Sequence, residues 1–360
     1  MKKLHQAFLV LAAGLLSGLA LVASATGTTA TPIVRHLQQP VRALAIDGDR
    51  VAYDLSSRDA KQRNAVNKLL VWNVRTGRTV KVSGKKTAIA DNTSTGLGVF
   101  QLAIAGARVA WLANEGGNLE STDYIFASSV TRPKERQVAS AMRSGDNCPG
   151  CSGQWLGGLV GSGNTIAFNR WTTDSLGQRA SGGLYLLNGS QTKSIATGTN
   201  TVQAVSSDAG REAVLHSDGS VAVYSKSGQA LVTLPPKNAK EAALNGKNLV
   251  VVSETRQLQV YDSRSGSLKK TLPTHGSGLH NLDVQGNIAI YTTQKSVRAV
   301  NLSSGKTRVV GTLRTQKGNV ILFACIGSAG LAYAANGVRA SFGKSTLVFV
   351  PLARVKAAVS

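Results

Sequence analysis

The sequence predicts an all-β protein, a seven-bladed β-propeller with four-stranded antiparallel blades. A ten-residue pattern, LAIDGDRVAY from Leu44 to Tyr53, recurs as LAIAGARVAW from Leu102 to Trp111. Weaker copies begin at Leu159, Val205, Ala242, Leu282 and Ala324. A period of about 40 residues built from short strands is typical of propellers. One small sheet buries neither face until neighbouring sheets stack on it.

Each copy of the pattern predicts a β-hairpin. Apolar and polar residues alternate on both sides of a turn, and glycine occupies the fifth position in most copies, as at Gly48. Glycine adopts the positive φ that a tight hairpin turn needs. A second pair of strands follows in most units, joined by turns such as Thr76-Gly77 and Ser265-Gly266. We therefore expect the ten-residue copies to form the inner strands, and the second pairs to form the outer strands.

The closure of the ring has two solutions. In the last unit, Ser345 to Leu352 corresponds to the fourth strand of a blade. Residues 33–38 (IVRHLQ) could add a closing strand to that blade, and Arg354 to Val359 could compete for the same edge.

The N-terminus predicts export. Two lysines precede the apolar run Ala7 to Val22, and Ala23-Ser24-Ala25 has the small residues of a signal-peptidase site. We expect residues 1–25 to be a signal peptide cleaved after Ala25, residues 26–32 to be a short linker, and residues 33–360 to form the propeller. The alternative is an uncleaved anchor, because the apolar run approaches the length that spans a bilayer. No later segment is long and apolar enough to cross a membrane. The expected location is secreted or extracytoplasmic.

The composition is strongly basic, with 41 Lys and Arg against 18 Asp and Glu and a net charge of +23. Such a charge attracts anionic partners. For an exported protein these are wall polymers, anionic lipids, acidic polysaccharides or extracellular nucleic acid. The alternative is that the charge serves solubility alone.

Two outer-strand segments carry a family resemblance. Residues 69–82 (LLVWNVRTGRTVKV) and 258–272 (LQVYDSRSGSLKKTL) resemble the outer half of a WD40, YVTN or quinoprotein-like propeller repeat. The resemblance covers residues 41–352. The blades lack the Gly-His and Trp-Asp pairs of WD40 repeats, and they lack the docking tryptophan that quinoprotein repeats place after the Thr-Gly turn. The resemblance therefore implies a fold, with no activity and no cofactor.

Five insertions lengthen the first three units, at residues 56–68, 83–98, 114–123, 141–153 and 170–182. All five join either the second strand to the third or one blade to the next, and such connections share one face of a propeller. Long loops on a rigid scaffold are where binding residues concentrate. The candidate binding residues on this face are Arg58, Lys61, Arg63, Lys85, Lys86, His275 and His280. The alternative is that the insertions are neutral surface elaboration.

The turns between third and fourth strands, expected on the opposite face, are rich in basic residues. They hold Arg75, Arg78, Arg132, Lys134, Arg136, Lys193, Lys226, Arg264, Lys306, Arg308 and Lys344, against only Glu135 and Asp262. This pattern suggests that the face lies against an anionic surface.

One local motif predicts a covalent bond. Cys148-Pro149-Gly150-Cys151 has the proline and glycine of a type II turn, which brings its end residues within reach of a disulfide. In an exported chain we expect a Cys148–Cys151 disulfide. Cys325, within an apolar strand, is expected to be a buried free thiol.

The histidines offer the strongest case for catalysis. His275 and His280, together with His216, could ligate a metal or act as acid and base. They have no carboxylate nearby in sequence, so we assign no catalytic residue, metal site or cofactor. Aromatic residues fall at equivalent strand ends and not among the basic residues, so no nucleic-acid motif is assigned.

These observations predict an exported, non-enzymatic propeller that binds a protein or an anionic polymer of the cell envelope. The alternative is a propeller enzyme, either a lyase or hydrolase that uses the histidines or a quinoprotein-like oxidoreductase.

Overall fold

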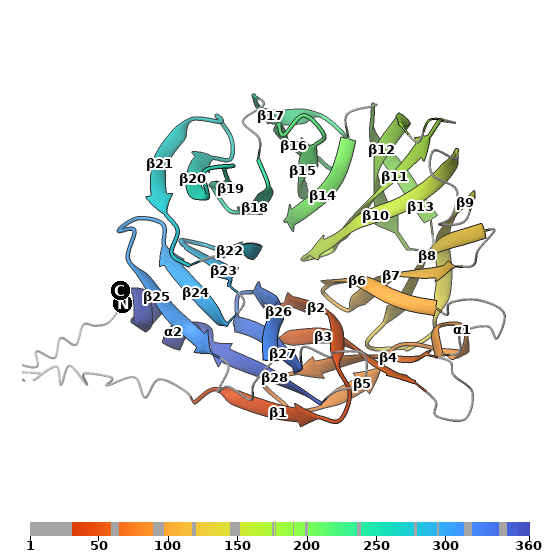
Figure 1. Cartoon of the computed structure of the whole chain (residues 1–360), viewed down its shortest axis with the longest axis horizontal. Coiled ribbons are helices and arrows are strands. Elements are labelled where there is room, and N and C mark those ends of the chain that lie inside the picture. The colour runs from red at the N-terminus through yellow and green to blue at the C-terminus, as the bar shows by residue number, and fades with distance from the viewer. Residues whose placement is uncertain are drawn as a thin grey trace, which may run out of the picture.

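A ring of antiparallel sheets surrounds a central axis (Figure 1). The computed structural model describes residues 31–58, 65–88, 97–116, 120–144, 152–174, 176, 178–189, 191–198, 201–235, 239–276, 279–293, 295–312, 319–337 and 344–360. The predicted signal peptide lies outside these ranges.

Five of the sheets are four-stranded blades. The first contains β2 (Val41–Asp47), β3 (Arg50–Arg58), β4 (Ala65–Asn73) and β5 (Thr79–Lys81). Another contains β14 (Thr201–Asp208), β15 (Arg211–His216), β16 (Val221–Ser225) and β17 (Ala230–Leu234). The next contains β18 (Glu241–Asn245), β19 (Asn248–Val252), β20 (Gln257–Asp262) and β21 (Leu268–Pro273). It is followed by β22 (His280–Gln285), β23 (Ile288–Thr292), β24 (Ser296–Asn301) and β25 (Thr307–Thr312). The closing blade contains β26 (Asn319–Ile326), β27 (Gly330–Gly337), β28 (Ser345–Pro351) and β1 (Ile33–Leu37).

The remaining sheet is continuous over eight strands. One half contains β6 (Leu97–Ala105), β7 (Arg108–Gly116), β8 (Glu120–Ser129) and β9 (Arg136–Ser144). The other half contains β10 (Gly153–Ser162), β11 (Thr165–Thr173), β12 (Arg179–Asn188) and β13 (Gln191–Gly198). The described helices are α1 (Lys85–Ala88) and α2 (Leu352–Val359).

The predicted four-stranded antiparallel propeller architecture is confirmed, but the predicted count of seven separate blades is wrong. The structure has five separate blades, because the two halves of the eight-stranded sheet join where Gly153 of β10 pairs with Arg143 of β9. The Arg143 side chain reinforces this junction. Its guanidinium lies 2.9 Å from the Asp123 carboxylate and 3.8 Å from the ring centre of Trp155.

The ten-residue repeat marks the inner hairpins. Leu44 pairs with Tyr53 across β2 and β3, and Leu102 pairs with Trp111 across β6 and β7. The first strands of the seven hairpins contact one another in chain order, and β26 contacts β2 to complete the ring. The aromatic residues at the repeat ends, such as Tyr53 and Trp111, are buried in the clusters between neighbouring sheets.

The N-terminal strand closes the ring. β1 pairs antiparallel with β28 as the outermost strand of the closing blade. Residues 352–359 form the helix α2 instead of a competing strand. Because β1 occupies the outer edge, Ser345–Pro351 (β28) is the third strand of the blade. The prediction that it is the fourth strand is wrong.

Arg35 of β1 extends the closure to the neighbouring blade. Its guanidinium lies 4.1 Å from the ring centre of Trp72. It also donates hydrogen bonds to the Gly77 carbonyl at 2.9 Å and to the Thr79 hydroxyl at 2.8 Å. The N-terminal strand therefore fastens the last blade to the first.

Candidate functional site

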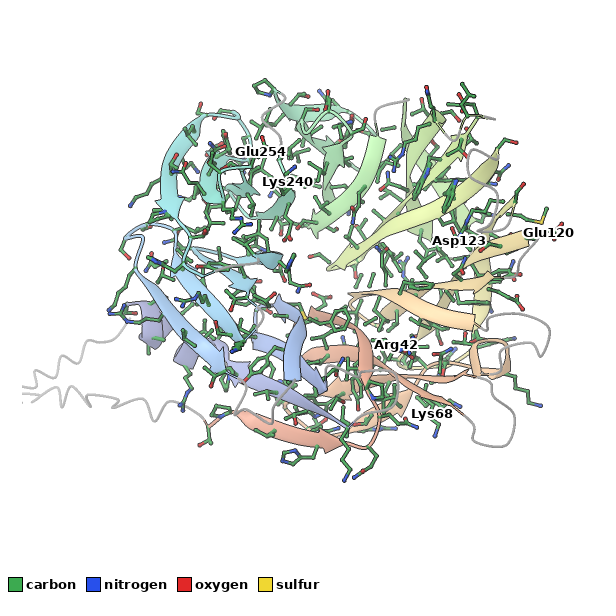
Figure 2. All side chains as sticks on the ribbon, viewed as in Figure 1. Arg42, Lys68, Glu120, Asp123, Lys240 and Glu254 are labelled. Carbon is green, nitrogen blue, oxygen red and sulfur yellow. The ribbon has the colours of Figure 1, made fainter. Side chains whose placement is uncertain are left out.

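The connections between strands define two faces. The short-turn face carries the turns between first and second strands, the turns between third and fourth strands, and α2. The long-loop face carries the other connections and α1. Figure 2 labels charged residues beside the long connections, among them Arg42, Lys68 and Lys240.

Exposed basic side chains surround the short-turn face. Every sheet except the closing blade supplies at least one from its turns, and α2 supplies two beside the closing blade. The exposed residues are Arg75, Arg78, Arg132, Lys134, Arg136, Lys193, Lys226, Lys247, Arg264, Lys306, Arg308, Arg354 and Lys356.

One predicted member of this set lies on the opposite face. Lys344 directly precedes β28, the third strand of the closing blade, so it belongs to a long connection. Helix α2 replaces it on the short-turn face. The Asn301 side chain donates to the Val359 carbonyl at 3.3 Å, and Leu352 N–H donates to the Ala329 carbonyl at 2.9 Å.

The turns of the short-turn face hold acidic groups that are already bound within the fold. The Asp49 carboxylate lies 3.2 Å from the Arg75 guanidinium. The Asp262 carboxylate is 2.9 Å from the Lys269 ammonium, and this contact with two backbone N–H groups holds the Asp262 pKa well below its usual range. Glu135 accepts from Gly84 N–H at 2.9 Å. The acidic groups therefore leave most of the basic side chains uncompensated.

At three seams of this face, neighbouring inner turns are fastened by a repeated set of hydrogen bonds, which we call the turn latch. The N–H of Gly106 donates to the Asp47 carboxylate of the preceding blade at 2.5 Å, and Arg50 donates to the Gly106 carbonyl at 2.9 Å. At the next example, Gly246 N–H donates to the Asp208 carboxylate at 2.9 Å.

A third latch joins the following two blades. Gly286 N–H donates to the Asn245 side chain at 2.7 Å, and Asn248 donates to the Gly286 carbonyl at 2.8 Å. At these three seams the fourth and seventh positions of the repeat therefore hold adjacent sheets in register.

A central cavity of about 790 Å³ follows the axis and is lined by the first strands of all seven hairpins. Its carboxylates belong to structural contacts. Asp283 accepts from Ile326 N–H of the closing blade at 2.8 Å, and burial raises its pKa to about 6. Glu241 accepts from Leu282 N–H at 2.7 Å, and burial raises its pKa as well.

The third cysteine lines the same cavity. Cys325 is a free thiol, and burial raises its pKa well above the usual value. A thiol that is protonated at neutral pH is a poor nucleophile.

The histidines do not converge on the cavity. His216, His275 and His280 are all absent from its lining. His280 Nδ1 lies 4.0 Å from a Glu241 oxygen, and 69% of the His280 side chain is exposed. The backbone of His275 donates to the Tyr291 hydroxyl at 2.8 Å, while its side chain faces solvent. Within the described ranges, no three His, Cys, Asp or Glu side chains group closely enough to hold a metal ion.

The predicted binding residues occupy separate places. Lys85 is exposed on α1, Lys86 belongs to the same helix, and Arg58 ends β3. His275 and His280 lie in and after the β21–β22 connection, on the other side of the ring from α1 (Figure 1). Lys61, Arg63, Cys148 and Cys151 lie outside the described residues, and so does the predicted disulfide.

An aromatic ladder at the long-loop end of the eight-stranded sheet was not anticipated. The rings of Trp155 and Trp171 are parallel within 2°, with centres 6.1 Å apart. Arg143 lies over the first ring, and Arg179 lies 4.7 Å from the centre of the second. The signal in the sequence is that both tryptophans fall outside the aromatic position of the repeat. Their arrangement stiffens the junction between β9 and β10.

Comparison with solved structures identifies the architecture. The WD40 β-propeller domain of Doa1 aligns with a TM-score of 0.53 and 11% identity, over 89% of this chain and 96% of that chain. The fold is a β-propeller. A computationally designed protein, Ika8, aligns with a TM-score of 0.47 and 15% identity, over 85% of this chain and 86% of that one. No family model matches the chain, and no curated protein matches it.

A search of the described residues for membrane-spanning helices finds none that is long and apolar enough. The observed helices are the short segments α1 and α2.

Proposed function

We propose that this chain is an exported, non-enzymatic binding module whose short-turn face docks on an anionic polymer of the cell envelope. The observation that carries the proposal is the distribution of charge on that face. Exposed Lys and Arg side chains surround it, while Asp49, Glu135 and Asp262 are engaged by groups of the protein itself. Connections held on a rigid scaffold are where binding residues concentrate, which agrees with this role.

Physical chemistry favours a polymer or surface over a small anion. The basic groups lie on separate sheets around a ring, so no single small anion reaches many of them. An extended polyanion contacts several at once. A Lys or Arg held near an anionic surface contributes about 1 kcal/mol each, and salt screens the attraction over about 8 Å at physiological ionic strength.

The test compares charge reversal on the two faces. One variant changes Arg78, Arg132, Lys193 and Arg264 to glutamate on the short-turn face. The matched control changes Arg42, Lys68, Lys85 and Lys344 to glutamate on the long-loop face. Both variants keep the same net charge, and all eight side chains are exposed. Binding to poly-L-glutamate is measured by calorimetry at low and high salt.

The proposal expects the short-turn variant to lose at least a hundredfold in affinity, because four reversals remove about 4 kcal/mol or more. The control is expected to lose far less, and high salt to weaken the unmodified chain. Equal losses in the two variants would show that binding follows net charge alone and would contradict a dedicated face.

A further inference from the structure

Among the described residues the turn latch joins three pairs of sheets, and the seam between the closing blade and the β2–β5 blade is one of those without it. This seam also carries a cleft. In the closing blade, the repeat positions that supply the latch side chains are Gly327 and Gly330. Neither glycine has a side chain that can reach across. Gly48 N–H, which corresponds to the latched N–H of Gly106, has no hydrogen-bond acceptor within the described part of the chain. An inner turn with an open donor therefore faces this seam.

A cleft of about 650 Å³ occupies the place of the missing latch. Its walls are largely apolar and include Ile33, Val74 and Phe349. Gly48 and Arg75 supply its polar edge. Asp49 also lines the cleft, but its carboxylate is bound by Arg75 at 3.2 Å and by the Asn73 side chain at 3.1 Å.

We propose that this cleft binds an acidic peptide segment of a partner protein, in which a carboxylate side chain stands beside an apolar one. The carboxylate accepts from Gly48 N–H in the same way that Asp47 accepts from Gly106 N–H at the neighbouring seam. Arg75 offers a second donor, because a guanidinium has five N–H groups and its side chain is 81% exposed beside Asp49. The apolar neighbour covers Val74 and Phe349.

The combination of polar and apolar residues in the lining favours a peptide over a polysaccharide as the ligand. A sugar acid provides the carboxylate but little apolar surface, whereas an Asp or Glu next to a Leu provides both. Backbone donors that capture a carboxylate, with an adjacent apolar pocket, are a recurring mode of peptide recognition. The site binds a single peptide and does not require a ligand of high charge density. It is therefore distinct from the polymer docking proposed above.

A single substitution supplies the missing acceptor from within the chain. The nearest atoms to a Cβ at Gly327 belong to the Ile46 side chain, at 3.4 Å or more, which is ordinary van der Waals contact. Gly327→Asp therefore places a carboxylate at the position that Asp47 holds at the next seam. Gly327→Ala adds the same Cβ without the acceptor and is the matched control.

The experiment titrates the ¹⁵N-labelled chain with the capped tripeptide acetyl-Leu-Asp-Leu-amide and follows the Gly48 amide resonance. We expect a saturable shift of that resonance with a Kd of about 1 mM, and binding at least tenfold weaker for the matching Asn peptide. Gly327→Ala should bind as the unmodified chain does. Gly327→Asp should lose the shift, and Arg75→Gln should weaken binding severalfold.

The inference is overturned by any of three results: no Gly48 shift with the Asp peptide, equal shifts with both peptides, or unchanged binding by Gly327→Asp. Poly-L-glutamate binding of Gly327→Asp is measured in parallel and is expected to weaken by no more than about fivefold, the effect of one charge on this face. Failure of the peptide site and failure of the polymer interface are therefore distinguished.

Discussion

Asp54 of β3 provides a sharp test of how the interior is built. Its side chain is fully buried, and neither carboxylate oxygen has a hydrogen-bond partner in the described structure. Burial raises its pKa from 3.8 to about 8, although the positive charge of Arg42 opposes this. Asp54 is therefore neutral in the folded protein at pH 7, and it ionises near pH 4 in the unfolded chain.

The sign and size of the effect on stability follow from proton linkage. Between pH 4 and pH 8 the folded state holds one more proton at Asp54 than the unfolded state. The contribution of Asp54 to the free energy of unfolding is therefore greatest below pH 4 and falls by about 1.4 kcal/mol for each pH unit up to pH 8. The full fall is about 5 kcal/mol, a large share of the 5–15 kcal/mol by which domains are stable.

The perturbation is Asp54→Asn, which keeps the shape and removes the ionisation. Near pH 4 the variant and the unmodified chain should differ by less than about 1 kcal/mol, because each buries a neutral polar group. Near pH 8 the variant should be more stable by about 5 kcal/mol. The assay is urea unfolding, followed by tryptophan fluorescence, at several values between pH 4 and pH 8.

Asp262→Asn is the control, because its pKa shift has the opposite sign. The ionised Asp262 is favoured by Lys269 in the folded state, so its contribution is present at neutral pH and is lost on acidification. A difference between Asp54→Asn and the unmodified chain that stays constant from pH 4 to pH 8 would refute the account of Asp54. It would show that Asp54 binds protons equally in the folded and unfolded chains, so that burial does not raise its pKa.

Three further changes test the packing. Gly158→Ala should destabilise the fold by more than about 3 kcal/mol, because φ is +59° and a Cβ would lie 2.5 Å from Ala204 N. Gly163→Ala, which has a similar φ but open space around it, should cost about 1–2 kcal/mol. Equal costs for the two variants in urea unfolding would contradict this. Arg143→Met should lower the free energy of unfolding by about 3–5 kcal/mol, because it leaves Asp123 buried without its ion pair. Adding Asp123→Asn should recover part of this loss. A cost below about 1 kcal/mol would show that the junction does not depend on this pair. Arg35→Ala should lower stability by about 1–2 kcal/mol, because it loses the contacts with Trp72, Gly77 and Thr79. His36→Ala, on the exposed side of β1, should leave stability unchanged. Similar thermal midpoints for the two variants would argue against closure through Arg35.

Much of the fold could be predicted from the ten-residue repeat, because its alternation and turn glycines are local properties of the sequence. The turns between outer strands, such as Thr76-Gly77, were predictable for the same reason. Both signals depend on residues a few positions apart. They therefore placed the inner hairpins correctly, and the basic outer turns everywhere except at Lys344 in the closing blade.

The closure and the joined sheet depend on partners that are distant in sequence. Residues 33–38 and 354–359 both offered a closing strand, and the choice follows from the pairing of β1 with β28 and from Arg35. The eight-stranded sheet depends on how the insertion between β9 and β10 brings Arg143 beside Gly153. No local pattern encodes either contact.

The candidate site was only partly predictable. The basic excess in the outer turns could be counted from the sequence, but the engagement of Asp49 and Asp262 needed the structure. Helix α2, which adds Arg354 and Lys356, reads in the sequence as a competing strand. The absence of the latch at Gly327 becomes visible only when the seams are compared.

The most direct measurement of the central claim is hydrogen exchange, followed by mass spectrometry, with and without poly-L-glutamate. The account predicts slower exchange in the outer turns of the short-turn face, at residues 74–79, 130–136 and 263–268, and unchanged exchange near Lys68, Lys85 and Lys240. Protection that appears on the long-loop face, or that spreads evenly over both faces, would contradict it.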